Sequence, residues 1–476
     1  MTDYLTEQLK NYFGYPSFRQ GQREAVEAAL NGEHTLVMLP TGTGKTLCYA
    51  LTGKLLNQLT IIVSPLLSLM QDQVNGMKRM GINRVAAITS MQNKNEKRTI
   101  LNHLDQYEFI YMSPEMLNNE HVLKALNKQN IGLFVVDEAH CISQWGMDFR
   151  PEYLQLGDVR KALGEPLTMS LTATATEDVR EEISHYLFEA NESVREIVYS
   201  VDRKNIAYHV ERCTGNKKEK LLEYANYLKK PGIIYFSSKK QADEMAELLD
   251  QKTTNHVVSY HGDLDHLDRT KIQANFLAGD IDIICATSAF GMGVNKNDIR
   301  FVIHYHLPGS PEEYLQEVGR AGRDGNKSLA ILLYEKGDES IQNYFIDSSL
   351  PSKATLDWIY QGNQATNGEE NINGYRLAEH FYQAQIPIDE ANQQVRERFN
   401  YRKNRLQIMI AYTGISTCYR SYLLNYFNEN IKDKVNKCCS NDEKTLVSWY
   451  LDSENIIVKQ NNSRNLHWRD ILEKLF

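Results

Sequence analysis

Short apolar segments recur along the chain, and amphipathic stretches separate them. Runs of four to eight mostly apolar residues between polar stretches predict buried strands. We expect strands at residues 59–63, 133–137, 168–172, 232–237, 281–286, 301–306 and 328–334, and helices at 19–30, 67–80 and 239–249. Because strands that alternate with helices are typical of parallel sheets, the pattern predicts an α/β protein.

The strand–helix pattern occurs twice, on either side of the polar stretch 202–205. Beyond Ile346, Asn, Gln and Glu become frequent and no strand pattern is clear. We therefore expect an α/β domain over residues 1–203, a second over 204–346, and a smaller, mostly helical region over 347–476.

Composition and charge bear on the cellular location and on the partners of the protein. The 476 residues carry a formal net charge of −8 and include seven cysteines, an odd number that disfavours a disulfide framework. No signal sequence or bilayer-length apolar segment is evident, so we expect a cytoplasmic protein. Residues 396–476 hold 14 Lys+Arg and 9 Asp+Glu, a net of +5, which leaves −13 for the rest. The charge neither requires nor excludes a nucleic-acid partner.

A strand, a glycine-rich turn and a helix start follow one another at residues 36–46. The turn reads Thr41, Gly42, Thr43, Gly44, Lys45 and Thr46. Glycines let backbone N–H groups converge on a phosphate, and a helix N-terminus adds a favourable dipole. Lys45 would reach the β- and γ-phosphates, and Thr46 would ligate Mg²⁺. Leu39 replaces the first glycine of the usual pattern, but the context disfavours the alternative, a plain strand–helix turn.

A second apolar strand ends in Asp137 and Glu138. Asp137 at a strand tip can hold Mg²⁺, and Glu138 can orient and deprotonate an attacking water. Alone, such a pair is more often the start of a solvated loop. Together with the phosphate loop, it predicts a nucleoside triphosphate site.

Arg320 and Arg323 stand three residues apart, and we expect one helix face to present both. They are either two surface arginines or an arginine finger for the γ-phosphate, an effect of about 10³–10⁵ in rate. The second reading makes hydrolysis depend on domain closure, as in a nucleotide-driven motor.

Over residues 9–336 these motifs resemble those of the RecQ family of superfamily 2 DNA helicases. The resemblance implies two tandem RecA-like domains, ATP and Mg²⁺ as cofactors, and 3′-to-5′ travel on single-stranded DNA. By resemblance, Tyr15, Arg19 and Gln22 contact adenine, Gln316 joins Lys45, Asp137, Glu138, Arg320 and Arg323 in catalysis, and Ser64 and Thr287 belong to elements that contact the strand.

The stretch 141–151 resembles the aromatic-rich loop by which RecQ proteins sense DNA. Trp145 and Phe149 beside Arg150 suit stacking on unpaired bases, worth about 1–3 kcal/mol per base. Aromatic pairs are more often part of a core, but the glycine, proline and charged neighbours favour a platform. Met147 stands where the family usually has His, which puts a polar coupling role there in question.

RecQ proteins commonly carry a zinc module after the motor, and residues 417–427 resemble its first half. The second half contains Cys438 and Cys439 but neither C-x-x-C nor a fourth thiolate. Asp442 or a distant His could complete a site with Cys418, yet a structural zinc needs four well-placed ligands. We therefore expect a metal-free helical module and no zinc site.

About 37 residues follow Cys439, and we expect them to form neither a winged helix nor a further helical domain. Contact with duplex DNA would then fall to residues 396–476, whose positive charge suits a phosphate backbone and a solvated surface equally well.

The leading hypothesis is an ATP- and Mg²⁺-dependent DNA helicase of recombination or repair, nucleoid-associated, acting on single-stranded and forked or partial-duplex DNA. The expected lack of a winged helix makes an ATP-driven translocase with weak strand separation the alternative. The aromatic-rich loop disfavours an RNA helicase of the DEAD/DEAH groups, and the intact hydrolytic residues disfavour a non-catalytic scaffold.

Overall fold

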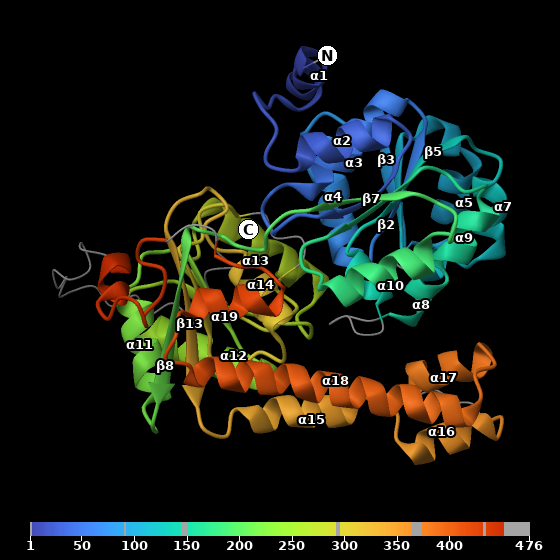
Figure 1. Ribbon diagram of the computed structural model, residues 1–476. Coiled ribbons are helices and arrows are strands. Elements are labelled where there is room, and N and C mark those ends of the chain that lie inside the picture. The colour runs from blue at the N-terminus through green and yellow to red at the C-terminus, as the bar shows by residue number, and fades with distance from the viewer. Residues whose placement is uncertain are drawn as a thin grey trace. The chain divides into compact units, whose positions relative to one another are not determined.

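The computed structural model describes residues 2–89, 92–143, 150–291, 296–363, 374–431 and 435–451. The chain forms two compact units, Met1–Asp202 and Arg203–Phe476. Each unit is built on one parallel sheet against which helices pack (Figure 1). The predicted α/β class with two sheets is confirmed.

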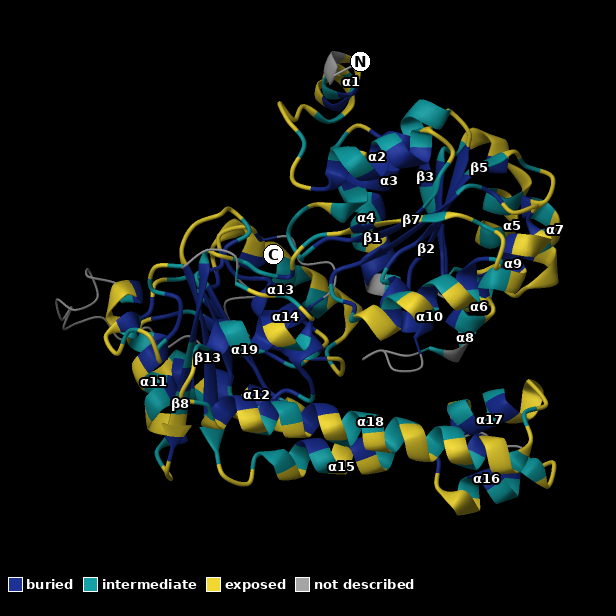
Figure 2. Ribbon diagram, viewed as in Figure 1, coloured by how far each residue is buried: buried dark blue, intermediate teal, exposed yellow. Residues whose placement is uncertain are grey.

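The first unit contains a seven-stranded parallel sheet in the order β3-β4-β2-β5-β6-β1-β7. Its strands are β1 (His34–Met38), β2 (Leu59–Val63), β3 (Val85–Ile88), β4 (Phe109–Met112), β5 (Ile131–Val136), β6 (Thr168–Thr172) and β7 (Val194–Val198). The inner strands are buried at nearly every position (Figure 2). This is the pattern expected where helices cover both faces of a parallel sheet.

Helices of the first unit precede the first strand or connect the strands. They are α1 (Thr2–Phe13), α2 (Gln22–Leu30), α3 (Lys45–Leu56), α4 (Leu67–Arg79), α5 (Lys94–Asn102), α6 (Pro114–Leu117), α7 (Glu120–Leu126), α8 (Pro151–Leu154), α9 (Leu156–Ala162) and α10 (Glu177–Leu187), with 3₁₀ turns η1 (Leu104–Gln106) and η2 (Ala139–Ile142). The helix predicted from residue 19 begins only at Gln22, because Gly21 adopts a left-handed φ of 78°. A Cβ on Gly21 would lie 2.4 Å from Leu39 Cδ2, so only glycine fits this turn.

The second unit has a six-stranded parallel sheet in the order β10-β11-β9-β12-β13-β8. Its strands are β8 (Ile206–Cys213), β9 (Gly232–Tyr235), β10 (Val257–Tyr260), β11 (Ile283–Ala286), β12 (Phe301–His304) and β13 (Ser328–Glu335). The apolar pattern did not predict β3, β4, β7, β8 and β10. Four of these five are edge strands, which are short or partly exposed and so lack a long apolar run.

Helices of the second unit fall into two groups. Those beside the sheet are α11 (Lys217–Tyr227), α12 (Lys239–Lys252), α13 (His266–Ala278) and α14 (Pro311–Val318); those of the helical region are α15 (Glu339–Ser349), α16 (Lys353–Tyr360), α17 (Tyr375–Gln383), α18 (Ile388–Gly414), α19 (Tyr419–Tyr426) and the 3₁₀ turn η4 (Leu446–Tyr450). Among the described residues, no helix has both the length and the apolar character needed to cross a bilayer.

The long helix α18 organises the helical region. It runs beside α15, packs against α16 and α17 near one end, and contacts α14 (Figure 1). Buried side chains of Leu356, Ile359, Tyr375, Ala378, Phe381 and Ala391 form a separate apolar cluster among α16, α17 and α18. This cluster gives the region a small core of its own.

The segment after α19 returns to the sheet and covers its β8 edge. The Tyr208 N–H donates to the Cys438 carbonyl at 3.2 Å, and the Ser440 N–H donates to the Tyr208 carbonyl at 3.0 Å. Leu446 and Tyr450 of η4 then join the apolar core of the second unit. An edge that would otherwise expose unpaired backbone groups is therefore partly covered.

Candidate nucleotide site, arginine turn and Cys/Asp cluster

The phosphate loop connects β1 with α3. Gly42 and Gly44 have left-handed φ values of 85° and 82°, and α3 begins at Lys45 without a side-chain cap. This geometry leaves the first N–H groups of α3 available to an anion. The Thr46 hydroxyl donates to Gln73 Oε1 at 3.1 Å, a positioning contact on α4 that the motif did not predict.

Two predicted adenine-contact residues hold the backbone of the phosphate loop. Gln22 Nε2 donates to the carbonyls of Thr43 (2.7 Å) and Gly44 (3.1 Å), while Gln22 Oε1 accepts from the Arg19 N–H at 2.8 Å. The Arg19 guanidinium donates to the Gly42 carbonyl at 2.6 Å. Tyr15 is 46% exposed, which leaves its ring free to stack. Base contact by these side chains stays a prediction.

The acidic pair lies where β5 ends, and Glu138 is strained. Glu138 has a left-handed φ of 50°, which is uncommon for a non-glycine residue and is often found at functional sites. Its N–H donates to Asp137 Oδ1 at 3.0 Å. Burial and the charge of Glu138 raise the pKa of Asp137 to about 7, an effect that the nearby Lys45 opposes. Helix α3, which begins at Lys45, contacts β5, which ends just before Asp137, so the two motifs lie beside each other in the first unit.

His140 links the acidic pair to the end of β6. Its Nδ1 lies 3.4 Å from Glu138 Oε2 and 3.0 Å from the Thr172 hydroxyl. Thr172 is the last residue of β6. One buried imidazole therefore lies between Glu138 and the end of β6.

The predicted DNA contacts are only partly described. Trp145 and Phe149 lie outside the described residues. Arg150 is partly exposed, with its guanidinium 4.0 Å from Glu115 Oε1. Thr287 is partly exposed at the end of β11, but Ser64 at the end of β2 is completely buried. This burial argues against a direct contact between the Ser64 hydroxyl and a DNA strand.

In the second unit, the expectation that one helix presents both arginines is wrong. Helix α14, which carries the buried Gln316, ends at Val318. Arg320 and Arg323 follow in a turn over residues 319–323, here named the arginine turn. Gly322 has a φ of 57°, and a Cβ there would lie 2.4 Å from Asn205 Nδ2. This left-handed glycine is incompatible with a continued helix.

The arginine turn concentrates positive charge. Arg320 is buried, and its Nη1 donates to the Gly291 carbonyl. A Cβ added to Gly291 would lie 2.6 Å from Arg320 Nη2. Burial, followed by the charges of Arg320 and Arg203, lowers the pKa of Arg323 from its usual value. Crowded, desolvated guanidinium groups favour an anion such as a phosphate.

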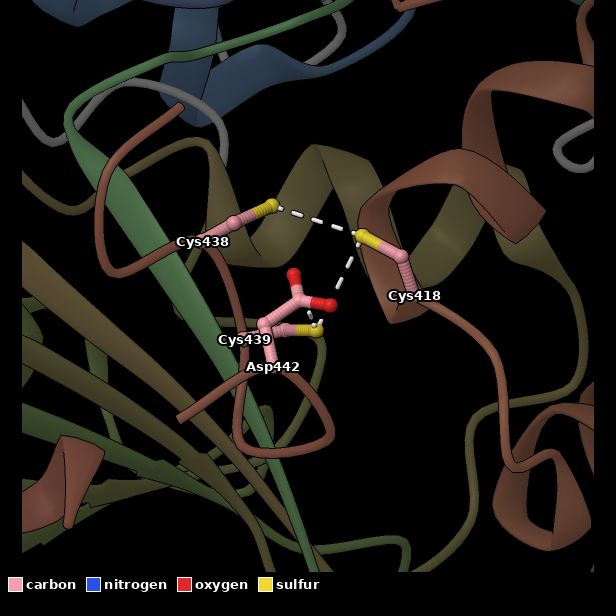
Figure 3. A group of neighbouring side chains, drawn as sticks. All are labelled: Cys418, Cys438, Cys439 and Asp442. Carbon is pink, nitrogen blue, oxygen red and sulfur yellow. Dashed lines mark hydrogen bonds between the residues drawn. The ribbon is translucent and has the colours of Figure 1, made fainter. Parts of the chain in front are cut away.

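Three cysteines and one aspartate meet where α19 begins. Figure 3 shows the side chains of Cys418, Cys438, Cys439 and Asp442 converging, with their ligand atoms within 4.8 Å of one another. The Sγ of Cys418 lies 3.4 Å from that of Cys438 and 3.7 Å from that of Cys439. Asp442 Oδ2 lies 3.3 Å from Cys439 Sγ. We name this group the Cys/Asp cluster.

The geometry of the cluster argues against the expected metal-free module. Zn²⁺ bonds of about 2.0–2.3 Å in a tetrahedron place ligand atoms about 3.3–3.8 Å apart, as several of these pairs are. In the sequence, two of the cysteines are adjacent and a fourth is missing, which disfavoured a metal site. The fold points both adjacent sulfurs at Cys418, and a carboxylate from the following turn supplies a fourth ligand.

Comparisons with known proteins identify families that match three parts of the chain. Residues 19–182 match the DEAD/DEAH box helicase family, 216–325 the helicase conserved C-terminal domain, and 376–443 the RecQ zinc-binding family. The probable ATP-dependent DNA helicase RecS of Bacillus subtilis is 40% identical over 92% of this chain and 91% of that protein. The ATP-dependent DNA helicase RecQ of Haemophilus influenzae is 34% identical over 90% of this chain, which spans 62% of that protein.

A solved structure supports the same fold. Saccharomyces cerevisiae Dbp5 bound to RNA and ADP BeF3 has a TM-score of 0.56 at 20% identity, covering 72% of this chain and 90% of Dbp5. The two parallel sheets are thus those of tandem RecA-like domains. Because 40% identity to a DNA helicase extends over nine-tenths of both chains, and because the chain also matches the RecQ zinc-binding family and RecQ itself, it belongs to the RecQ family of ATP-dependent DNA helicases.

Proposed function

We propose that this chain is an ATP- and Mg²⁺-dependent helicase that moves 3′ to 5′ along single-stranded DNA and separates forked or partial duplexes. The observation that carries the proposal is the strained Glu138, held beside Asp137, whose carboxyl is under the electrostatic influence of Lys45. A scaffold protein has no need for such an arrangement. Relatives named as DNA helicases support DNA as the substrate.

In the first unit, the proposed roles follow from position. Lys45 and the N–H groups of the phosphate loop bind the phosphates. Thr46 and Asp137 would hold Mg²⁺, which neutralises charge on the phosphate oxygens when bound. Glu138 accepts a proton from the attacking water, and His140 keeps its carboxylate in place. Tyr15, Arg19 and Gln22 are assigned to binding of adenine. Arg19 and Gln22 also hold the backbone of the phosphate loop.

In the second unit, Gln316, Arg320 and Arg323 are assigned to stabilising charge on the γ-phosphate during transfer. Trp145, Phe149 and Arg150 of the first unit are assigned to sensing unpaired bases. Coupling of this sensor to Glu138 would explain how DNA stimulates hydrolysis. A role in recombination or repair in the bacterial cytoplasm fits the bacterial relatives.

For the Cys/Asp cluster we infer one bound Zn²⁺. Cys418, Cys438 and Cys439 would supply thiolates and Asp442 a carboxylate oxygen. Cys418 precedes α19, whereas the other three residues follow it. The ion would therefore fix the helical region on the β8 edge of the sheet.

The decisive experiment compares ATP hydrolysis with and without single-stranded DNA, and unwinding of a fork, on one preparation. We expect strong stimulation by DNA together with strand separation. Lys45→Ala should abolish hydrolysis and leave strand binding largely intact. Lys54→Ala is the matched control, because Lys54 lies on the same helix but pairs with Glu108 at 2.6 Å. Stimulated hydrolysis without separation would replace the helicase by a translocase.

A further inference from the structure

The side chain of Arg203 holds the backbone of the arginine turn. Its guanidinium donates to the carbonyls of Gly319 (3.1 Å), Ala321 (3.2 Å) and Gly322 (2.7 Å). These carbonyls flank Arg320 and precede Arg323. Because a guanidinium is planar and its donors form a rigid fork, one side chain fixes the path of the whole turn.

A second arginine, Arg420 of α19, holds the backbone of Arg203. Arg420 is 1% exposed, and its Nη1 donates to the Arg203 carbonyl at 3.1 Å. Its Nη2 donates to the Ile206 carbonyl, at the start of β8. Its Nε donates to Cys438 Sγ at 3.1 Å. The contacts form a continuous path from the Cys/Asp cluster through two arginines to the arginine turn.

We propose that Arg203 and Arg420 are positioning residues that orient Arg320 and Arg323 for phosphoryl transfer, with Cys438 as the anchor. The proposal rests on the proposed function of the arginine turn. A misplacement of about 1 Å in a catalytic group can cost about 100-fold in rate, so loss of this path should slow the chemical step. Binding of ATP itself should change little.

Simple support of the fold does not account for this arrangement. The neutral amide of Asn205 already donates to the carbonyls of Gly322 and Asn326, each at 2.8 Å. Adding Arg203 places a third positive charge near Arg320 and Arg323, where it disfavours the charged form of Arg323. The arrangement costs electrostatic free energy that an anion near the arginine turn would offset. An anion is what the proposed reaction brings there.

The test compares Arg203→Gln, Arg420→Gln and the double variant with wild type. We expect Arg203→Gln to lower the DNA-stimulated kcat about 10- to 100-fold while the KM for ATP stays within about twofold. Binding of ADP with aluminium fluoride, a mimic of the transferring phosphoryl group, should weaken by a similar factor, and binding of ADP alone should not. Arg420→Gln should act in the same direction, and the double variant should be no slower than Arg203→Gln.

Arg212→Gln is the matched control. Arg212 lies on β8 and donates from Nε to the Thr413 carbonyl at 2.8 Å, so it ties the sheet to α18 without contact to the arginine turn. We expect it to lower the Tm and leave kcat unchanged.

An unchanged kcat in Arg203→Gln would overturn the proposal, as would equal weakening of ADP and ADP–aluminium fluoride binding. If the effects of Arg203→Gln and Arg420→Gln on kcat multiply in the double variant, the two arginines act independently, which would contradict the proposed path. In each case an active wild type and an inactive Lys45→Ala would leave the proposed function standing. A wild type without ATP hydrolysis would refute both.

Discussion

Arg405 of α18 and Glu312 of α14 form a buried ion pair that joins the helical region to the helix carrying Gln316. Arg405 Nε and Nη2 each lie 2.8 Å from Glu312 Oε1. Tyr426 of α19 donates its hydroxyl to the same oxygen at 2.6 Å. Helices α18 and α19 therefore meet α14, which is distant from both in sequence, at one carboxylate.

Removing one partner of this pair should be costly. Arg405→Met leaves the buried Glu312 carboxylate with an uncompensated charge, so we expect the second unit to lose about 3–5 kcal/mol of stability, measured by urea unfolding. The double variant Arg405→Met/Glu312→Met should recover much of the loss. Lys124→Met is the control, because Lys124 and Glu120 form an exposed pair and should contribute less than about 0.5 kcal/mol. A loss for Arg405→Met no larger than this would contradict the prediction.

Two buried histidines should make the second unit sensitive to acid. Burial lowers the pKa of His304 and of His306 to about 3, from 6.5 in an unfolded chain. Below pH 6.5 the unfolded chain binds protons that the folded chain does not, so stability falls as pH falls. The slope is about 1.4 kcal/mol per pH unit for each histidine between these pKa values.

The measurement is unfolding between pH 7.5 and 5. His304→Gln should give a shallower dependence on pH than wild type, although it also loses the 2.7 Å contact between His304 and Glu317 and lowers stability at every pH. Equal slopes for wild type and His304→Gln would show that His304 is not held neutral.

The Cys/Asp cluster predicts a metal content. We expect about one zinc per chain by mass spectrometry of the purified protein, and release by a chelator should lower the Tm. Cys439→Ala should lose the metal, whereas Cys285→Ala, a buried cysteine of β11, should retain it. Asp442→Cys should hold zinc at least as tightly as wild type. Absence of zinc after reconstitution with the ion would contradict this prediction and support a metal-free module.

Trp145 provides a test of DNA sensing that does not depend on the described geometry. Trp145→Ala should keep basal hydrolysis and lose most of its stimulation by single-stranded DNA, because a stacking surface for bases is removed. Trp358→Ala in α16 is the control and should retain stimulation. Equal stimulation of Trp145→Ala and wild type would exclude the platform.

Local sequence was sufficient for the phosphate loop and for every interior strand of the two sheets except the four-residue β4. At β2 and β6 the predicted and observed bounds coincide, because a fully buried parallel strand needs a continuous apolar run. Lys45 and Asp137 were recognisable because their chemistry depends on a short segment of fixed local geometry. The edge strands were missed, since their pairing is decided by neighbours rather than by their own pattern.

Tertiary structure decided the rest. Arg420 and Ile206 are 214 residues apart, and no local pattern predicts their contact. From the sequence, we did not expect the adjacent Cys438 and Cys439 to bind one metal ion. In the structure, hydrogen bonds to the β8 edge fix the backbone beside them. Arg320 and Arg323 lie on a turn that contains the left-handed Gly322. A side chain at Gly322 would collide with Asn205, which is more than a hundred residues earlier in the sequence. Local propensities act within a few residues, whereas these sites depend on which distant groups the packed sheets bring together.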